Sequence, residues 1–300
     1  MKNLSNNKNE DEIVTLLNSG AKVDYQITID DFDKKKRLIK KLINESEGFI
    51  DGVEAIGDDN FPPHKGVVNN SEKPIFLFYR GNLTLLEETN NNVAVIGLLN
   101  PDGETEEIER EVVARLVENG ATILSGLAFG CDSIAHKQAL NSNAHTVAIL
   151  PSPLNNILPG KNKELANEIV RKSGLLVTEY LTDAKSKREM GGRYQERDRL
   201  QALFSNIIIL SASYAKNDLG NDSGSRLAMG YALGYSIPRA VIYDSKKNSN
   251  NPKYDLSRQL IEEDPKIIVI DQNNMPSIIT KLMSIKPKIE KAQPSQQGLL

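Results

Sequence analysis

The sequence predicts an α/β protein with an extended, Rossmann-like, doubly wound and mostly parallel sheet, preceded by a small N-terminal helical region. From residue 92 onward, short apolar β-branched runs alternate with helical stretches, which is typical of parallel strands connected by helices. The runs are apolar at nearly every position, so each strand is expected to be buried on both faces of the sheet. Seven runs fit this description: VAVIG from 93, ATILSG from 121, HTVAIL from 145, GLLVTE from 174, NIIIL from 206, PRAVIY from 238 and KIIVI from 266.

We divide the chain into three segments. Residues 1–72 are expected to form an N-terminal helical and irregular region, with helices near 11–17 and 33–43, where apolar residues recur at helical spacing. Residues 73–285 are expected to form the Rossmann-like domain. Residues 286–300 are polar and carry Pro and Gln, so we expect a disordered tail.

The sequence predicts two further elements of the domain, a strand and a helix. The run IFLFY, residues 75–79, is apolar enough for a buried strand. Residues 104–119 place Ile108, Val112 and Leu116 on one apolar stripe, and Gly120 provides a C-terminal stop, so a helix is expected there.

Composition limits the possible classes of protein. The chain has 300 residues, 39% hydrophobic residues, a formal net charge of -3 and a pI near 5.8, so it does not coat nucleic acid by bulk charge and any polyanion site must be local. A single cysteine excludes an internal disulfide, and the three histidines have no metal-ligand spacing. No apolar run approaches the length of a membrane span. We therefore expect a cytoplasmic protein with no membrane contact, no metal and no resident cofactor.

A glycine loop is the first candidate site. SGLAFGCDSIAH, residues 125–136, follows a predicted strand and leads into a predicted helix, where open α/β sheets bind ligands. Gly126 and Gly130 allow close backbone approach, while Ser125 and the first N–H groups of the helix can donate to a phosphate, with Asp132 as a plausible N-cap. The alternative is that the glycines only make a tight turn, and spacing alone does not decide between the two.

Three other stretches are candidate phosphate-binding segments, because they carry positive charge or precede a second predicted helix. Between residues 185 and 199, six basic residues face three acidic ones, and Arg197 and Arg199 precede a strand, which suits phosphate binding. The alternative is a solvated helix face on which Glu196 and Asp198 pair with these arginines. The other two stretches are Ser223, Gly224 and Ser225 before a predicted helix, and the turn ILPGKN with Lys161.

The ordered motifs resemble the DprA/Smf family of DNA-processing proteins. SGLAFGCDSIAHKQAL is similar to the family's SGLARGID-x-x-AH-x-x-AL stretch, and VAVIG to its first Rossmann strand. PIFLFYRGNLTLL, ILPGKNKEL, GLLVTEY, RYQERDRLQALFSNIIIL and NDSGSRLAMGYALGYSIPRAVIY resemble its other segments in the same order, from about residue 61 to residue 243.

The resemblance implies a non-enzymatic, dimeric protein that binds single-stranded DNA and helps to load a RecA-type recombinase during DNA uptake and recombination. It also implies DNA contacts at the glycine loops and basic residues of one sheet edge. The candidate nucleic-acid or phosphate-binding residues are Gly97, Ser125, Gly126, Phe129, Gly130, Lys161, Arg197, Arg199, Ser223, Gly224 and Ser225.

Several positions depart from the family pattern. Leu99 and Phe129 stand where the family has phosphate-binding arginines, and Asp198 replaces the central residue of its RNR motif. Each lost contact reduces the salt dependence of DNA binding. Phe129 could stack on a base, but we favour packing against its own domain.

The alternative function is a nucleotide-binding sensor or a nucleotide phosphoribohydrolase-like module of the same superfamily. The loss of arginines with the glycine loops retained favours it. Against the hydrolase, the chain has no PGGxGTxxE motif, and neither His136 nor Cys131 has a partner that would make it a general base or a nucleophile. We therefore expect no catalytic residue.

Overall fold

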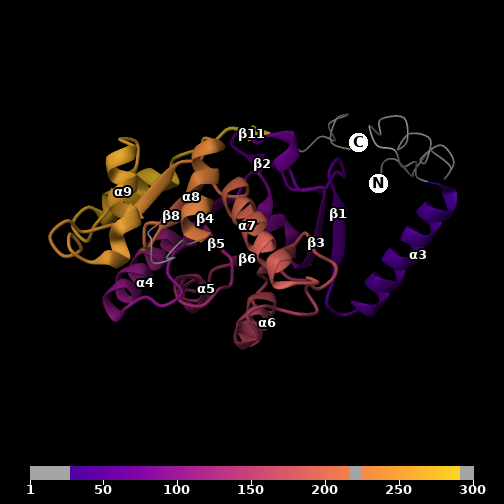
Figure 1. The fold of residues 1–300 in the computed structure, drawn as a ribbon. Coiled ribbons are helices and arrows are strands. Elements are labelled where there is room, and N and C mark those ends of the chain that lie inside the picture. Colours follow the sequence, from indigo (N-terminus) through magenta and orange to yellow (C-terminus); the bar gives the residue numbers. More distant parts are fainter. Residues whose placement is uncertain (1–27, 217–223, 291–300) are drawn as a thin grey trace.

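A nine-stranded sheet organises the computed structural model of the protein, which describes residues 28–216 and 224–290. The strand order is β1-β3-β7-β6-β5-β4-β8-β9-β10, and β11 and β2 form a separate two-stranded sheet (Figure 1). The strands are β1 (Gly52–Ala55), β2 (His64–Lys65), β3 (Phe76–Gly81), β4 (Asn91–Ile96), β5 (Ala121–Ser125), β6 (Thr146–Ile149), β7 (Leu175–Thr178), β8 (Ile207–Leu210), β9 (Arg239–Ile242), β10 (Ile268–Ile270) and β11 (Ile289–Glu290). The α-helices are α3 (Ile29–Glu45), α4 (Gly103–Glu118), α5 (Cys131–Asn141), α6 (Lys163–Arg171), α7 (Lys187–Leu203), α8 (Gly224–Gly234), α9 (Asp255–Glu263) and α10 (Met275–Met283).

The parallel part of the sheet reverses its winding direction beside β4. From β4 the chain moves outward through β5, β6 and β7, then returns to the other side of β4 and continues through β8, β9 and β10. β3 pairs antiparallel with β7 and β1 antiparallel with β3, so these two strands extend the sheet at one edge. In an open α/β sheet, ligands bind where the winding reverses, which here lies at the carboxyl ends of β4 and β8.

Helices cover both faces of the sheet. Val93 and Val95 of β4 pack with α4, α5 and α10 on one face, whereas Ala94 and Ile96 pack with α7, α8 and α9 on the other. A third apolar cluster joins α6 to β3 and β7. None of the helices in the described ranges has the length and apolarity needed to cross a membrane.

The predicted doubly wound sheet is confirmed. Each of the seven predicted runs forms a strand, and all four residues of β8 are buried, as its uninterrupted apolar sequence predicts. The helix expected at 33–43 begins earlier, at Ile29, because Thr28 forms a capping box with Asp31. The helix expected at 11–17 lies outside the described residues.

Ordered pairing at both ends of the predicted domain was not expected from the sequence. β1 lies within the region expected to be helical or irregular, yet it pairs with β3, so the sheet continues across the predicted boundary at residue 73. β11 lies within the tail that was expected to be disordered, where Ile289 pairs with Lys65 of β2. Both strands are too short to show a period in sequence, and distant partners supply their hydrogen bonds.

Candidate nucleic-acid interface

A pocket of about 730 Å³ opens where the sheet reverses its winding. Its walls come from the loop after β4, the glycine loop after β5, one face of α7 and the first residues of α8. Segments far apart in the sequence therefore meet at one edge of the sheet, as the motifs predicted. The lining residues are Ile96, Gly97, Leu98, Leu99, Asn100, Ala128, Phe129, Asp132, Pro159, Tyr194, Arg197, Asp198, Gln201, Tyr214, Gly224, Ser225, Ala228 and Lys253.

Gly130 sets the turn from the glycine loop into α5. It is the N-cap residue, with φ of +69°, and a side chain there would overlap the backbone of Leu98 and Leu99. The next N–H, that of Cys131, donates to the Leu98 carbonyl (2.9 Å). Gly130 therefore joins two loops at the pocket but does not itself line it.

Asp132 occupies the anion site that the glycine loop forms. It is not the N-cap that the sequence suggested: its Oδ2 accepts the N–H groups of Gly126 (3.1 Å) and Ala128 (3.2 Å). The carboxylate thus accepts the hydrogen bonds that these two amides could otherwise donate to a bound anion. Gly126 was expected to allow close approach of a ligand, and in the structure the Arg197 guanidinium occupies the space beside it.

Ser125 is also used internally. It is fully buried at the end of β5, and its Oγ donates to the Val95 carbonyl (2.7 Å) of the neighbouring strand. Its predicted contact with phosphate is wrong, because the side chain points into the sheet. In contrast, Gly97, Gly224 and Ser225 line the pocket, and Ser225 Oγ donates to the Gly97 carbonyl (3.3 Å).

The two predicted arginines of α7 have different positions. Arg197 lines the pocket and is 7% exposed, with its guanidinium against Gly126 and between Asp132 (Nη1–Oδ2, 3.4 Å) and Asp198 (Nε–Oδ1, 3.2 Å). The Asp198 contact has ion-pair distance without hydrogen-bond geometry.

Arg199 lies outside the pocket lining. It pairs with Glu179 (2.8 Å) and Glu196 (3.0 Å). The predicted phosphate contact of Arg199 is thus wrong in this arrangement, because two carboxylates already neutralise it. The alternative interpretation, in which acidic neighbours pair with the arginines, is correct about the partners, although the arginines are buried rather than solvated.

Phe129 lies at the surface of the pocket. Its side chain is 41% exposed and that of Leu99 is 65% exposed. Phe129 was expected to pack into its own domain, but the structure leaves it exposed in the pocket lining. Tyr194 and Tyr214 add two more rings to the lining. An apolar and aromatic surface of this kind can stack with a base.

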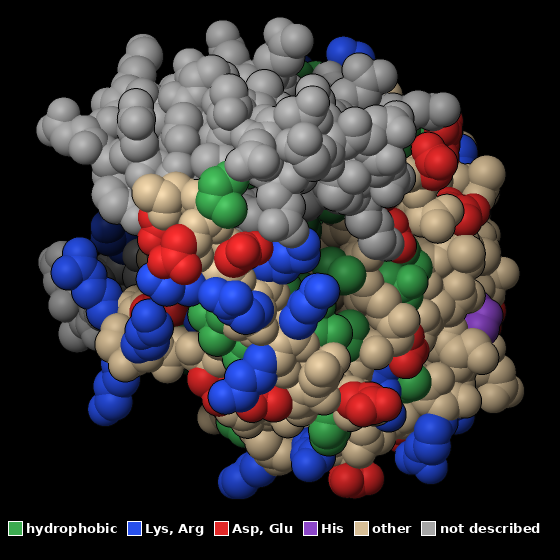
Figure 2. All heavy atoms as spheres, turned by 90° about the vertical axis from the view of Figure 1, so that its right-hand side faces the viewer, with side chains coloured by type: hydrophobic (Ala, Val, Ile, Leu, Met, Phe, Trp, Pro, Cys, Tyr) green, Lys and Arg blue, Asp and Glu red, His purple; other side chains and the backbone are tan. Residues whose placement is uncertain are grey.

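Exposed basic side chains lie outside the pocket. Lys161 is exposed in the short 3-10 turn Gly160–Asn162, and Asn162 ties this turn to the glycine loop by donating to the Leu127 carbonyl (2.8 Å). Lys185, Lys187 and Arg188 are exposed at the start of α7. Figure 2 shows Lys and Arg side chains gathered on the face that includes α3, interspersed with acidic ones. Ser223, the remaining predicted contact, lies outside the described residues.

Several lining residues were not predicted. Tyr194, Asp198 and Gln201 follow one another at helical spacing, and the face they share with Arg197 could have been recognised from that spacing. Lys253 lies in the short 3-10 helix Pro252–Tyr254, which precedes α9, and pairs with Asp102 (3.0 Å); no local pattern in the sequence indicates its place.

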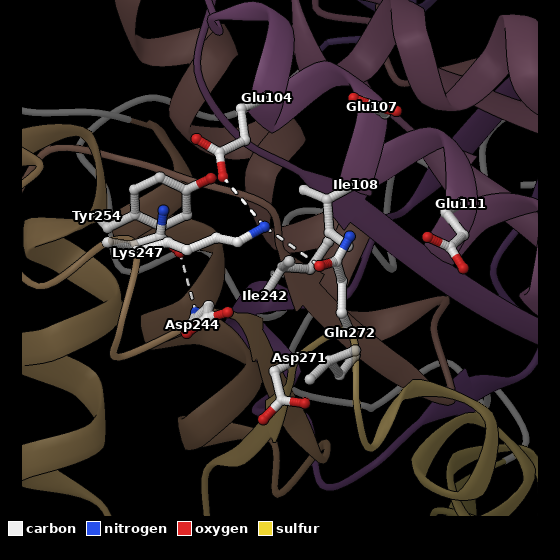
Figure 3. A pocket seen from close by; sticks show the side chains of 12 residues that line it. Glu104, Glu107, Ile108, Glu111, Ile242, Asp244, Lys247, Tyr254, Asp271 and Gln272 are labelled. Carbon is white, nitrogen blue, oxygen red and sulfur yellow. Dashed lines mark hydrogen bonds and ion pairs between the residues drawn. The ribbon is translucent and has the colours of Figure 1, made fainter.

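A second pocket, of about 120 Å³, lies beside α4 and the ends of β9 and β10, and its charge excludes it as a phosphate site. Figure 3 shows Lys247 reaching toward Glu104 (3.6 Å) and Gln272 (3.2 Å) within a lining that is otherwise acidic. The carboxylates of this lining are Glu104, Glu107, Glu111, Asp244 and Asp271.

Three buried groups beneath the glycine loop do not reach the pocket surface. His136 contacts Thr146 Oγ1 (2.7 Å), and burial lowers the pKa of its ring to about 3. Burial also raises the pKa of Cys131 well above its usual value, with a further contribution from the Glu109 charge. Burial raises the pKa of Glu109 to about 8. Cys131 and Ser211 lie beside the Glu109 carboxyl without making a hydrogen bond of good geometry to it. None of the three groups is arranged as a catalytic base or nucleophile.

Comparison with known proteins agrees with this architecture. Residues 53–277 match the family model of DNA recombination-mediator protein A. Protein Smf of Borreliella burgdorferi is 29% identical over 206 residues, which is 63% of this chain and 62% of that protein. Protein Smf of Synechocystis sp. is 32% identical over 146 residues, which is 48% of this chain and 36% of that protein. The chain thus matches less than two thirds of either relative.

Two solved structures are similar as well. DNA processing protein A of Streptococcus pneumoniae superimposes with a TM-score of 0.68 at 24% identity, over 92% of this chain and 88% of that one. DNA processing protein A of Helicobacter pylori, whose structure was described for its single-stranded DNA binding mode, gives a TM-score of 0.58 at 26% identity, over 75% of this chain and 97% of that one. With three quarters of the chain matched by the family model, and with the fold and the ordered motifs in agreement, the protein belongs to the DNA recombination-mediator protein A family.

Proposed function

We propose that the protein binds single-stranded DNA, without catalysis, at the pocket between β4, β5 and β8. The observation that carries this proposal is the exposed Phe129 ring in the pocket that Arg197 also lines, at the edge where two glycine-containing helix N-termini meet. A ring at the mouth of such a pocket offers stacking to any base, and Lys161 lies on the neighbouring turn for a phosphate. The family membership and the named DNA binding of the Helicobacter pylori relative support it.

We further propose that the chain acts in the cytosol as a homodimer, in DNA uptake and recombination, and delivers the bound strand to a RecA-type recombinase. This part depends on the family alone. Only three of the basic residues between 185 and 199 are exposed, because Arg193, Arg197 and Arg199 all contact acidic or carbonyl oxygens of the chain. Affinity should therefore come from stacking combined with a small number of phosphate contacts.

Phe129→Ala tests the stacking contact. We expect roughly tenfold weaker binding of a fluorescent oligothymidylate, because stacking on one aromatic ring contributes about 1–3 kcal/mol per base. Phe129→Tyr keeps the ring and is the matched control, which should bind like the wild type. Equal affinity of the alanine and tyrosine variants would place the bases away from this pocket.

Lys161→Gln tests the phosphate contact through salt dependence. The slope of log K against log salt is negative, and its magnitude should decrease by about 0.7 for one lost contact on a single strand, whereas Phe129→Ala should leave the slope unchanged. Glu107→Gln, at an exposed position on α4, controls for net charge. A Lys161 variant with the wild-type slope would remove this lysine from the interface.

A mononucleotide is the second candidate ligand, favoured by the pocket volume of about 730 Å³ and its mixed aromatic and polar lining. Thermal denaturation in the presence of mononucleotides separates the two functions. A ligand present at a hundred times its Kd would add about 2.7 kcal/mol to the free energy of unfolding. Stabilisation by a mononucleotide, without any binding of oligonucleotides, would favour the nucleotide sensor over DNA binding.

A further inference from the structure

Two carboxylates compete for one guanidinium at the floor of the pocket. Asp132 of α5 and Asp198 of α7 both lie within ion-pair distance of Arg197, and all three side chains are less than a tenth exposed. All three also line the pocket. With both carboxylates ionised the cluster carries a net negative charge, which opposes a phosphodiester at this position.

The two carboxylates are held differently. Asp132 accepts two backbone N–H groups in addition to its contact with Arg197. Among the residues that the structure describes, Asp198 accepts one hydrogen bond, from Gln201 Nε2 (3.1 Å), and it faces the start of α8 at Gly224. Burial raises the pKa of Asp198 to about 7. Arg197 opposes this shift and the Asp132 charge adds to it. Asp198 is therefore the member of the cluster that accepts a proton near neutral pH.

The other groups around the cluster do not replace Asp198 in this role. Tyr231 of α8 is close enough to be affected by its charge, and burial raises the pKa of that phenol above its ordinary value, so it stays neutral here. Lys253 lines the same pocket but pairs with Asp102. Lys65 of β2, which packs against α7, donates to Asn206 (2.8 Å) near the far end of that helix.

We propose that Asp198 couples binding of a DNA phosphodiester in this pocket to the uptake of one proton. When Asp198 is neutral, Arg197 and Asp132 balance each other and the pocket accepts the negative strand. When Asp198 is ionised, the cluster repels the strand. The residue is a positioning residue that acts through Arg197, and its role rests on the proposed binding of single-stranded DNA.

The test measures affinity and proton uptake together. Binding of an oligothymidylate to the full chain, at constant ionic strength, should weaken about tenfold between pH 6 and pH 8.5, since one linked proton changes affinity by up to tenfold per pH unit. Asp198→Asn should bind at both pH values about as tightly as the wild type does at pH 6. Titration calorimetry near pH 7.5, in two buffers of different ionisation enthalpy, should detect proton uptake by the wild type and none by Asp198→Asn.

The other possible outcomes distinguish failure of the role of Asp198 from failure of the proposed DNA binding. Binding by the wild type without pH dependence or proton uptake would overturn the role of Asp198 and leave DNA binding intact. Proton uptake that persists in Asp198→Asn would assign it to another group and also overturn the inference. Absence of binding by both proteins at pH 6 and low salt would overturn the proposed function together with this inference. Glu107→Gln removes one exposed carboxylate and should keep the wild-type pH dependence.

Discussion

Replacing Arg197 by Met is expected to lower the free energy of unfolding at pH 8 by about 3–5 kcal/mol, because removal of one partner leaves buried carboxylates without compensation. Methionine retains most of the side-chain volume, so the decrease in the free energy of unfolding measures the effect of removing the charge rather than of creating a cavity. Asp132 and Asp198 would then face each other in a buried site. The measurement is urea denaturation at pH 6 and pH 8.

The pH dependence of this loss follows from Asp198. The folded-state pKa of Asp198, about 7, lies above its ordinary value of 3.8, so the stability linked to its proton is fully present below pH 3.8 and is lost as pH rises through 7. The cost of Arg197→Met should therefore be smaller at pH 6 than at pH 8. The double variant Arg197→Met, Asp198→Asn should recover part of the stability at pH 8. Strict additivity of the two substitutions would contradict the coupling of the cluster.

Glu109→Gln should stabilise the protein at alkaline pH. The carboxyl is fully buried on α4, and its pKa of about 8 lies above the ordinary value of 4.5. Between these pH values the folded chain keeps a proton that the unfolded chain has released, so wild-type stability falls as pH rises through 8. The neutral amide does not titrate, and its advantage over the wild type should approach roughly 5 kcal/mol at pH 8.5, at about 1.4 kcal/mol per pKa unit.

The control lies on the same helix. Glu107→Gln removes an exposed carboxylate and should change stability by less than about 0.5 kcal/mol at any pH. Urea denaturation at pH 5 and pH 8.5 compares the two variants with the wild type. If the difference between Glu109→Gln and the wild type is the same at both pH values, Glu109 does not carry a buried proton.

The prediction of the sheet succeeded where local sequence is sufficient. The run Ile207–Leu210 is apolar and β-branched at nearly every position, which is typical of a strand that is buried on both faces. β1 and β11 were not predicted because each is a short strand whose pairing with Phe76–Gly81 or with His64–Lys65 depends on residues elsewhere in the chain.

The sequence indicated which backbone segments come together at the candidate site, but not where several of its side chains lie. Gly97, Phe129, Arg197, Gly224 and Ser225 do meet in one pocket, because the carboxyl ends of adjacent parallel strands place their following loops together. The structure does not favour the phosphate contacts expected of Ser125 and Arg199, since each side chain already has a partner within the chain, and Arg197 occupies the space beside Gly126.

The sequence by itself determined the doubly wound sheet, the sheet edge at which the glycine loops gather and the membership of the family, since apolar periodicity and ordered motifs are local properties of the chain. Only the tertiary structure decided which charges remain available there. Asp132 and Arg197 are 65 residues apart in sequence, yet the Arg197 guanidinium contacts the Asp132 carboxylate in the glycine loop. The same guanidinium lies within ion-pair distance of Asp198, so the three charges form one cluster. Charge balance in a buried site depends on distances between groups of different elements, and these distances exist only in the folded chain.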